Sequence, residues 1–257
     1  MSEVRWEISD GIAVVTLAAP ERRNALTVRM AGELEAAFDE VDARDDVGAV
    51  VVRGSGGSFC AGAHLGVLGE AAQDPLDDDA QRDIDALYGS FLRVGRCRTA
   101  TIAAVRGAAV GAGLNLALAT DLRIVARDAR LISGFLRIGV HPGGGHFTLL
   151  SRAAGRDAAA AVGLFGHEID GERAAALGLA WQAVDDADAE ATALQVAARL
   201  GKDPALARRM AATFRREAGP PATSWDVGLE IERGPQMWSF RRRAKASAAW
   251  CPDGGAP

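Results

Sequence analysis

The sequence predicts an α/β fold from two features of its order. From the N-terminus to about residue 190, short apolar strands alternate with loops of small residues and with helical patterns. The rest of the chain carries helical patterns alone, and no repeat of short period is present. This order is typical of α/β proteins, and it leaves open whether the sheet is doubly wound or coiled as a spiral.

Composition narrows the class of protein. The 257 residues suit one large domain or a domain with an appendage, and a hydrophobic content of 49% suffices for a core. A net charge of −5 argues against a nucleic-acid partner. The irregularly spaced Cys60, Cys97 and Cys251 predict neither a disulfide framework nor a metal site, which favours a reducing compartment. The start of the chain lacks a basic segment followed by an apolar run, and no stretch suits a bilayer, so we expect a cytoplasmic protein without a membrane partner.

Local signals position the first elements. Asp10-Gly11 between two apolar runs predicts a β-hairpin. Residues 20–26 are expected to form a loop, and Thr27 is expected to cap the helix that follows. The apolar run at 48–52 predicts a buried strand, which leads into a glycine-rich loop at 54–65.

Hydrophobic spacing places the later elements. We expect helices at about 65–75, 84–97 and 114–119, an acidic solvated loop at 74–79, strands at 122–125 and 130–135, and a loop at 139–146. Helical patterns then cover 147–154, 156–164, 171–177, 188–200, 204–217 and 225–233. Gly234-Pro235 is expected to break the chain before a final helix that starts at Gln236.

Two loops share one character, which is a set of small residues directly behind an apolar strand. The first is the loop at 54–65, and the second, at 107–113, follows the apolar run at 102–105. Small side chains leave backbone N–H groups unshielded, and such groups can hold a developing negative charge on oxygen. Either loop alone would pass for a glycine-rich surface turn. The pair can aim one N–H each at a single carbonyl oxygen, which predicts a two-donor oxyanion hole.

Three blocks resemble the signatures of the crotonase (enoyl-CoA hydratase/isomerase) superfamily, namely residues 59–63, 107–114 and 121–126. The blocks occur in the family's order, and the likeness runs from about residue 11 into the helical C-terminus. The resemblance implies a crotonase-like spiral of ββα turns with an all-helical C-terminal trimerisation region. It divides the chain into a spiral core with the acyl-CoA site, residues 1–190, and a helical region for oligomerisation and pocket cover, residues 191–257.

The resemblance also implies that the protein binds an acyl-CoA thioester and stabilises its enolate. By position the two N–H donors are Ala63 and Ala112, the latter where the family usually has glycine. CoA would lie against Ala25, Ala61 and Leu65, with its phosphates near Arg22 or Arg23 and near the basic residues Arg241, Arg242, Arg243 and Lys245. A guanidinium group pairs well with phosphate, although solvated surface arginines would give the same sequence.

The two glutamates that hydratases of this family use are replaced here by Asn115 and Phe135. Neither side chain accepts a proton from water at neutral pH, and acid–base groups typically contribute about 10²–10⁴-fold, so we expect weak hydration of 2-enoyl-CoAs. Histidine titrates near neutrality, so His64, His141 and His146 are candidate acid–base groups. Each of them could instead be a packed or solvent-facing polar residue.

The reaction therefore stays open. The protein could be a lyase or isomerase of fatty acid metabolism, or it could run another crotonase reaction (isomerase, thioester hydrolase or decarboxylase) with a loop histidine. It could also be a non-catalytic acyl-CoA binder, or a structural member of a hexamer with an unused pocket.

We expect no permanently bound cofactor and no metal, with CoA entering as part of the substrate. The expected partners are acyl-CoA and further copies of the chain, as a trimer or a dimer of trimers. Asp121 is expected to be structural, and His167 to lie on the surface.

Overall fold

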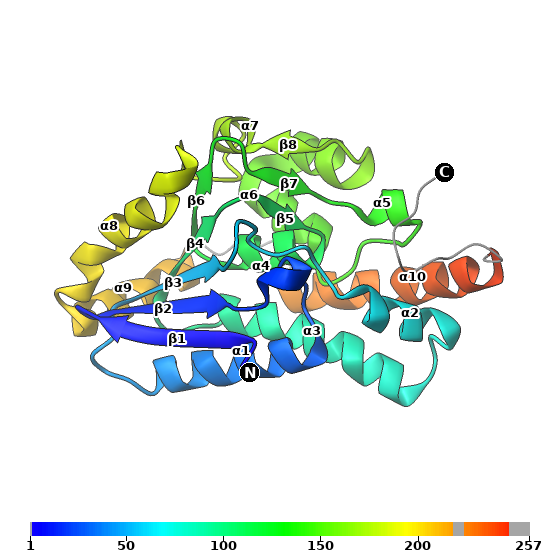
Figure 1. Ribbon diagram of the computed structural model, residues 1–257, viewed down its shortest axis with the longest axis horizontal. Coiled ribbons are helices and arrows are strands. Elements are labelled where there is room, and N and C mark those ends of the chain that lie inside the picture. The colour runs from blue at the N-terminus through cyan, green and yellow to red at the C-terminus, as the bar shows by residue number, and fades with distance from the viewer. Residues whose placement is uncertain (1, 218–223, 247–257) are drawn as a thin grey trace.

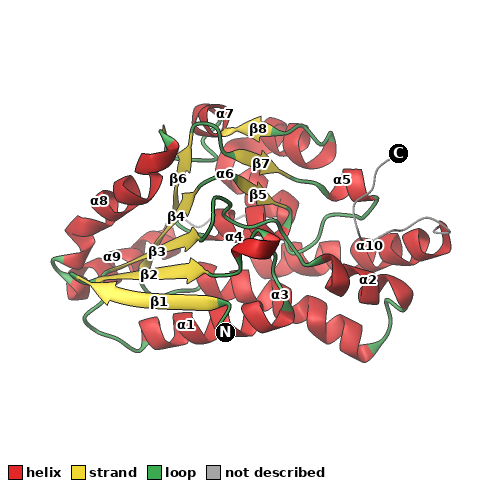
Figure 2. Ribbon diagram, in the orientation of Figure 1, coloured by secondary structure: helices red, strands yellow, loops and turns green. Residues whose placement is uncertain are grey.

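Two β-sheets organise the computed structural model, which describes residues 2–217 and 224–246 (Figures 1 and 2). In this part of the chain six strands form the larger sheet, in the order β1-β2-β3-β4-β6-β9, and three form the smaller one, β5-β7-β8. The strands are β1 (Val4–Ser9), β2 (Ile12–Leu17), β3 (Ala49–Gly54), β4 (Ala100–Val105), β5 (Ala108–Val110), β6 (Leu122–Ala126), β7 (Arg130–Ile132), β8 (Ile169–Asp170) and β9 (Gln182–Val184). The pairs β1–β2 and β7–β8 are antiparallel and the other pairs are parallel. The predicted α/β class is confirmed.

The turn between β1 and β2 follows from Asp10-Gly11. Both residues have positive φ, 51° and 73°, which is the two-residue turn that suits the twist of a hairpin. A Cβ at Gly11 would lie 2.9 Å from Gly201 Cα, so the turn also needs glycine in order to approach the end of a distant helix. The predicted hairpin is confirmed.

Helices cover both faces of the larger sheet (Figure 1). The side chains of β3 alternate, so Val50 and Val52 share a core with α1 (Val28–Asp42), while Ala49 and Val51 pack with residues of α8 (Ala189–Gly201). A parallel strand that is buried on both faces reads as a continuous apolar run, as 48–52 does. Thr27 caps α1 by accepting a hydrogen bond from Met30 N at 3.0 Å, as predicted.

The expected division of the chain between residues 190 and 191 falls inside α8. Ala193 and Ala197 of this helix are fully buried against Ile12 and Ile102 of the sheet. The first helix of the expected C-terminal region therefore belongs to the core.

The other helical segments are η1 (Pro20–Arg22), α2 (Leu65–Gln73), α3 (Asp78–Gly95), α4 (Ala112–Ala119), α5 (Phe135–Ile138), α6 (His146–Ala159), η2 (Ala160–Leu164), α7 (Gly171–Ala176), η3 (Asp186–Asp188), α9 (Pro204–Glu217) and α10 (Trp225–Ala246). Most agree with the predicted patterns within a few residues, and three features differ. Asp77 caps α3, so Asp78 and Asp79 begin a helix, while residues 74–77 form the predicted loop. The strand expected to reach Phe135 ends at Ile132, because Gly134 turns left-handed and starts α5.

The helix α10 is continuous through Gly234-Pro235, where a break was predicted. It packs against α2 and α6, and such tertiary contacts can override the local cost of a proline in a helix, about 3 kcal/mol. In the described part of the chain, no helix combines the length and the apolar character that a membrane crossing requires.

Candidate active site

The two glycine-rich loops lie side by side. Cys60 N–H donates to Ala108 O, and Val110 N–H donates to Cys60 O, both at 3.0 Å. A Cβ built on Gly62 would lie 3.7 Å from Ala112 N, and one on Gly113 would lie 2.8 Å from Cys60 Cβ. Small residues at these positions are therefore what allows the two backbones to meet.

The N–H of Ala63 points away from the loop at 23–26. Leu26 N–H donates to Gly62 O at 2.7 Å, and His64 N–H donates to Leu26 O at 2.8 Å. In a parallel bridge of this kind, the residue between the two bonded groups turns its own N–H away from its partner. The Ala63 N–H donates to no acceptor within the residues that the structure describes.

The N–H of Ala112 is at the start of a buried helix. Ala112 is the first residue of α4, and Gly111 before it has a φ of 52° and a ψ of −115°, which bends the chain into the helix. The first N–H groups of a helix have no partner within the helix, and they carry the positive end of its dipole. In the described part of the chain Ala112 N–H has no acceptor, so two unpaired donors stand on adjacent loops.

A hydrogen-bonded group of buried polar side chains lies behind the start of α4. Asn115 Nδ2 donates to Gly143 O at 3.0 Å, and Asn115 Oδ1 lies 2.7 Å from His146 Nδ1. The other ring nitrogen, His146 Nε2, lies 2.8 Å from Ser133 Oγ. Ser133, Asn115 and His146 are exposed by 3%, 1% and 0%, so the group is shielded from bulk water.

The donor and the acceptor of each hydrogen bond in this group can be assigned from the Gly143 carbonyl. Gly143 O can only accept, so the Asn115 amide must turn its NH₂ toward it and its oxygen toward His146. Because that oxygen can also only accept, His146 Nδ1 carries the proton. His146 Nε2 is then the acceptor, and Ser133 Oγ–H donates to it.

Burial lowers the pKa of His146 to about 3. The imidazole is therefore neutral at physiological pH, and it offers no proton as a cation. Although predicted as a loop residue, His146 is the first residue of α6. At neutral pH its Nε2 remains a hydrogen-bond acceptor for Ser133.

The Phe135 ring stands between the start of α4 and His146. A Cβ on Gly111 would lie 3.6 Å from Phe135 Cζ, and the Phe135 and His146 rings meet edge to face with centroids 5.0 Å apart. The ring is half-buried and apolar. It therefore covers one side of the buried polar group.

Side chains from α3 and α10 enclose the loop at 143–145. A Cβ at Gly144 would lie 2.6 Å from Phe91 Cζ, so glycine is needed beneath this ring. Trp225 stacks on Phe91 with centroids 6.0 Å apart and donates from Nε1 to Gly144 O at 3.2 Å. These contacts fix the loop whose Gly143 carbonyl orients Asn115.

The other two candidate histidines already serve the backbone. His64 caps α2, and its Nδ1 accepts from Gly66 N at 3.2 Å. His141 Nδ1 lies 2.7 Å from Pro142 O, and its ring packs edge to face on Phe147. The structure brings only His146 into the group with Asn115 and Phe135. His167 is exposed, as predicted.

The two arginines at the expected CoA edge differ. Arg22 pairs with Glu3 at 2.7 Å and with Glu21 at 3.0 Å, so its charge is already engaged. Arg23 is exposed, and its carbonyl accepts from Ala61 N at 2.9 Å. The loop at 23–26 thus lies along Ala61 and Gly62, with Ala25 buried and Leu65 exposed by 40%.

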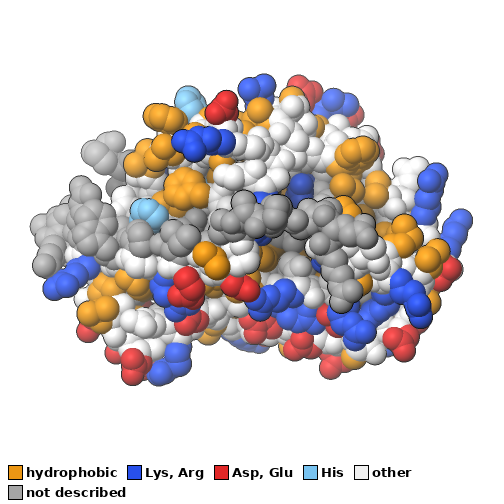
Figure 3. Space-filling view, turned by 180° about the vertical axis from the view of Figure 1, so that it is seen from behind, with side chains coloured by type: hydrophobic (Ala, Val, Ile, Leu, Met, Phe, Trp, Pro, Cys, Tyr) orange, Lys and Arg blue, Asp and Glu red, His pale blue; other side chains and the backbone are white. Residues whose placement is uncertain are grey.

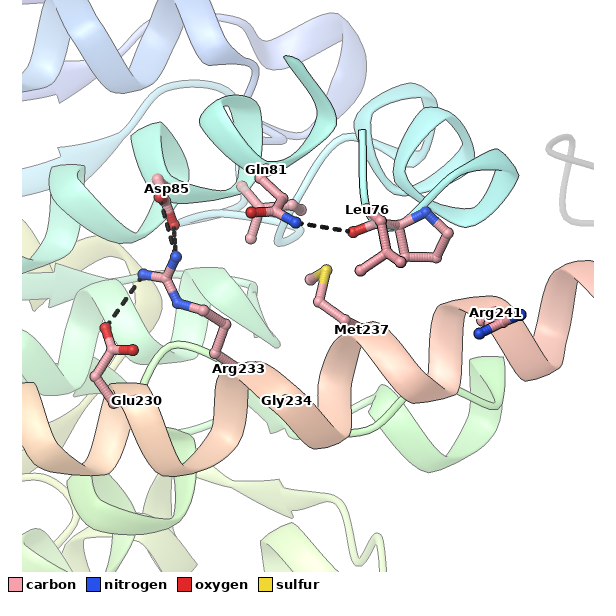
Figure 4. A pocket seen from close by; sticks show the side chains of 10 residues that line it. Leu76, Gln81, Asp85, Glu230, Arg233, Gly234, Met237 and Arg241 are labelled. Carbon is pink, nitrogen blue, oxygen red and sulfur yellow. Dashed lines mark hydrogen bonds and ion pairs between the residues drawn. The ribbon is translucent and has the colours of Figure 1, made fainter. Parts of the chain in front are cut away.

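A cavity of about 520 Å³ lies under α10 (Figure 4). Arg233 reaches from α10 to Asp85 at 2.8 Å, and Met237 points into the space. None of its lining residues comes from the two loops that carry Ala63 and Ala112. Arg241 is exposed at its rim, whereas the side chains of Arg242, Arg243 and Lys245 lie outside what the structure describes.

Asp121 has the structural role that the sequence suggests. Its carboxylate accepts from Thr101 N and Oγ1 at 2.8 and 3.0 Å, and it pairs with Arg215. Sequence reasoning missed Ser133 and the Gly143 carbonyl. No local signal marks either one, because their partners come from other elements of the fold.

Three comparisons place this geometry among known proteins. Residues 7–227 match the family model described as enoyl-CoA hydratase/isomerase. The chain is similar to "Probable enoyl-CoA hydratase EchA14" of Mycobacterium tuberculosis, at 42% identity over 93% of this chain and 92% of that protein. It is also similar to 1,2-epoxyphenylacetyl-CoA isomerase of Escherichia coli, at 31% identity over 94% of this chain and 91% of that protein. A crystal structure of an enoyl-CoA hydratase/isomerase from Xanthobacter autotrophicus superposes with a TM-score of 0.82 and 32% identity, covering 100% of this chain and 99% of that one.

Proposed function

The chain belongs to the enoyl-CoA hydratase/isomerase family, and from that premise we propose that it binds an acyl-CoA thioester through the N–H groups of Ala63 and Ala112. The observation that carries the proposal is the pair of unpartnered backbone donors on adjacent loops of the described chain. Two fixed donors suit an oxygen that gains negative charge as the thioester enolises. The start of α4 adds its dipole to the same point.

Removing one donor tests this proposal. Ala112→Pro deletes the N–H at the first position of a helix, where proline is tolerated. We expect the variant to lose up to about tenfold in acyl-CoA affinity, the worth of one hydrogen bond, and about 10²–10³-fold in any turnover. Binding of a CoA thioether, which lacks the carbonyl, should stay unchanged in calorimetry.

Asp78→Pro is a matched control, because Asp78 is the exposed first residue of α3. It should leave both affinities as they are. Equal binding of the thioester and the thioether by wild type and Ala112→Pro would contradict the oxyanion hole.

Ordinary hydratase activity should be weak. Asn115 uses both ends of its amide on Gly143 O and His146, so it has little left with which to orient a water. Phe135 places a ring where the family has its second glutamate, and a ring moves no proton. Crotonyl-CoA hydration should rise in the Asn115→Glu/Phe135→Glu double variant over wild type. Wild-type turnover in the ordinary enzyme range, about 1–10³ per second, would contradict this expectation.

Self-association is the second part of the proposal. Leu206, Met210 and Phe214 recur every four residues on α9, and they are exposed by 52%, 56% and 56%. Figure 3 shows that hydrophobic side chains gather in several groups on one face of the molecule. An exposed apolar stripe of this kind marks a contact surface, which supports a trimer or a dimer of trimers. Light scattering of wild type should give a trimer or hexamer at micromolar concentration, and a stable monomer would contradict it. A cytoplasmic location stays a prediction.

A further inference from the structure

We propose that Ser133, His146 and Asn115 act as nucleophile, base and orienting group, and that they transfer the acyl group of a bound thioester to water. The inference rests on the proposed function, because the oxyanion hole would have to present the thioester carbonyl.

The three side chains have the mutual geometry that nucleophilic catalysis requires. A hydroxyl donates to one ring nitrogen of a histidine at 2.8 Å, and the other ring nitrogen donates to a fixed acceptor at 2.7 Å. The directions of both bonds follow from the Gly143 carbonyl, as derived above. Asn115 thus holds His146 in the tautomer that leaves Nε2 free of its own proton and facing Ser133 Oγ.

The backbone of Ser133 adjoins the segment that carries the donor Ala112. The last pair of the β5–β7 ladder is Val110 with Ile132, and the next residues along the two strands are Gly111 and Ser133. Gly111 N–H donates to Ile132 O at 2.9 Å, and a Cβ on Gly111 would lie 3.5 Å from Ser133 O. Ala112, the donor, is the next residue in the chain. The fold therefore places the hydroxyl and the N–H on adjoining backbone segments.

The proposed step balances as an acyl transfer. Ser133 Oγ forms a bond to the thioester carbon while its proton passes to His146 Nε2, and the carbonyl oxygen takes the negative charge between Ala63 and Ala112 N–H. The carbon–sulfur bond then breaks, and the CoA sulfur leaves with the proton from His146. Water attacks the acyl-serine in the same way and releases the carboxylic acid. The net reaction consumes one thioester and one water and gives free CoA and an acid.

The groups around Ser133 determine the rate expected for this reaction. The imidazole is neutral at physiological pH, so Nε2 can accept the serine proton, but the burial that lowers its pKa also makes it a weak base. Asn115 is also neutral and gives the imidazolium no opposing charge, which makes the step slower than with a carboxylate in that place. The Phe135 ring covers the group and keeps bulk water away from it. Slow turnover and a long-lived acyl-enzyme are the expected behaviour.

Acyl-enzyme formation is the measurement. The protein is mixed with acetyl-CoA, octanoyl-CoA and phenylacetyl-CoA, free CoA is quantified by chromatography, and the intact protein and its peptides are weighed. At least one of the three thioesters should give free CoA and an acyl adduct on the peptide that contains Ser133. Ser133→Ala should remove the adduct and lower CoA release by about 10³-fold or more, with thioester affinity within twofold of wild type.

Two further variants separate chemistry from structure. Ser90→Ala is the matched control, because Ser90 is also buried and donates to Leu87 O of its own helix at 2.7 Å. It should release CoA as wild type does. Ser133→Cys keeps a nucleophile and should still become acylated, which a merely structural hydroxyl would not explain.

The outcomes distinguish this proposal from the one on which it rests. Failure to bind any of the three esters would overturn the proposed acyl-CoA site. Binding without CoA release or adduct, or CoA release that Ser133→Ala leaves unchanged, would overturn the role of Ser133 alone.

Discussion

The two halves of the site differ in what they do with their polar groups. Within the described residues, the backbone N–H groups of Ala63 and Ala112 have no partner, and the side chains around them are small. In the wall formed by Asn115, His146 and Ser133, each side chain is engaged with a neighbour. Under the proposed function the two donors would receive charge from a ligand, whereas the three side chains already bond one another. In the proposed site, a backbone donor, Ala112, and an engaged side chain, Asn115, therefore stand next to each other on the same helix, α4.

The strongest way to break this contrast is to force the two loops apart. In Gly113→Ala the new methyl would lie 2.8 Å from Cys60 Cβ and closer still to the Cys60 carbonyl. Because backbone must move to relieve this, we expect loss of about 3 kcal/mol or more in stability and complete loss of acyl-CoA binding. Urea denaturation and calorimetry measure the two effects.

Gly32→Ala is the control for Gly113→Ala. It is also a glycine inside a helix, but a Cβ there meets nothing within 4 Å. It should raise stability by about 0.5–1 kcal/mol and leave binding unchanged. If Gly113→Ala kept stability and acyl-CoA binding as Gly32→Ala should, the close contact of the two loops would not be needed for either.

Acid should destabilise the folded protein by protonating His146, which is buried as a neutral ring. The folded-state pKa of His146 is about 3, below the ordinary value of 6.5, so the unfolded chain binds the proton more readily. This histidine therefore lowers stability as the pH falls below 6.5, by about 2 kcal/mol at pH 5, and the loss stops growing near pH 3. Glu33, whose pKa is lowered to about 2, acts only below its own ordinary value of 4.5.

The measurement is the difference in unfolding free energy between pH 7 and pH 5. It should shrink by about 2 kcal/mol in His146→Gln and stay as in wild type in His167→Gln, the exposed control. Equal pH dependence in all three proteins would show that His146 is not buried as a neutral ring.

The smallest expected effect is on CoA binding by the two arginines, Arg22 and Arg23. Arg23→Ala should weaken acyl-CoA binding by up to about 1 kcal/mol at low salt, and the loss should fade as salt rises. Arg22→Ala should affect binding less, because Arg22 is held by Glu3 and Glu21. Titrations at two salt concentrations compare them, and a larger effect at Arg22 would reverse the assignment.

Features set by neighbours in the chain could be predicted from the sequence. The turn at Asp10-Gly11 and the cap at Thr27 depend on residues within three positions of them. The same holds for the two glycine-rich loops, since small residues after an apolar strand predict backbone N–H groups that side chains do not shield. Their adjacency was predicted from the pairing of two similar segments, and the structure places them in contact.

Features set by distant partners could not be predicted. Arg22 reads as a phosphate ligand until Glu3, far back in the chain, is seen to hold it. Ser133 reads as part of a strand until β7 and the loop at 143–145 bring it to His146. The helix α10 continues through Pro235 because its packing outweighs a local breaker. In each case the deciding interaction joins elements whose relative positions only the fold defines.

The contact between Trp225 and the loop at 143–145 gives this protein a built-in optical reporter. The indole is stacked on Phe91 and bonded to Gly144 O, and the next carbonyl back along the loop, that of Gly143, is the one that orients Asn115. Indole fluorescence depends on polarity and on hydrogen bonding at the ring nitrogen. A shift of this loop on binding would therefore change the emission of Trp225, and because the chain has five tryptophans, comparison with Trp225→Phe would isolate its share of the signal.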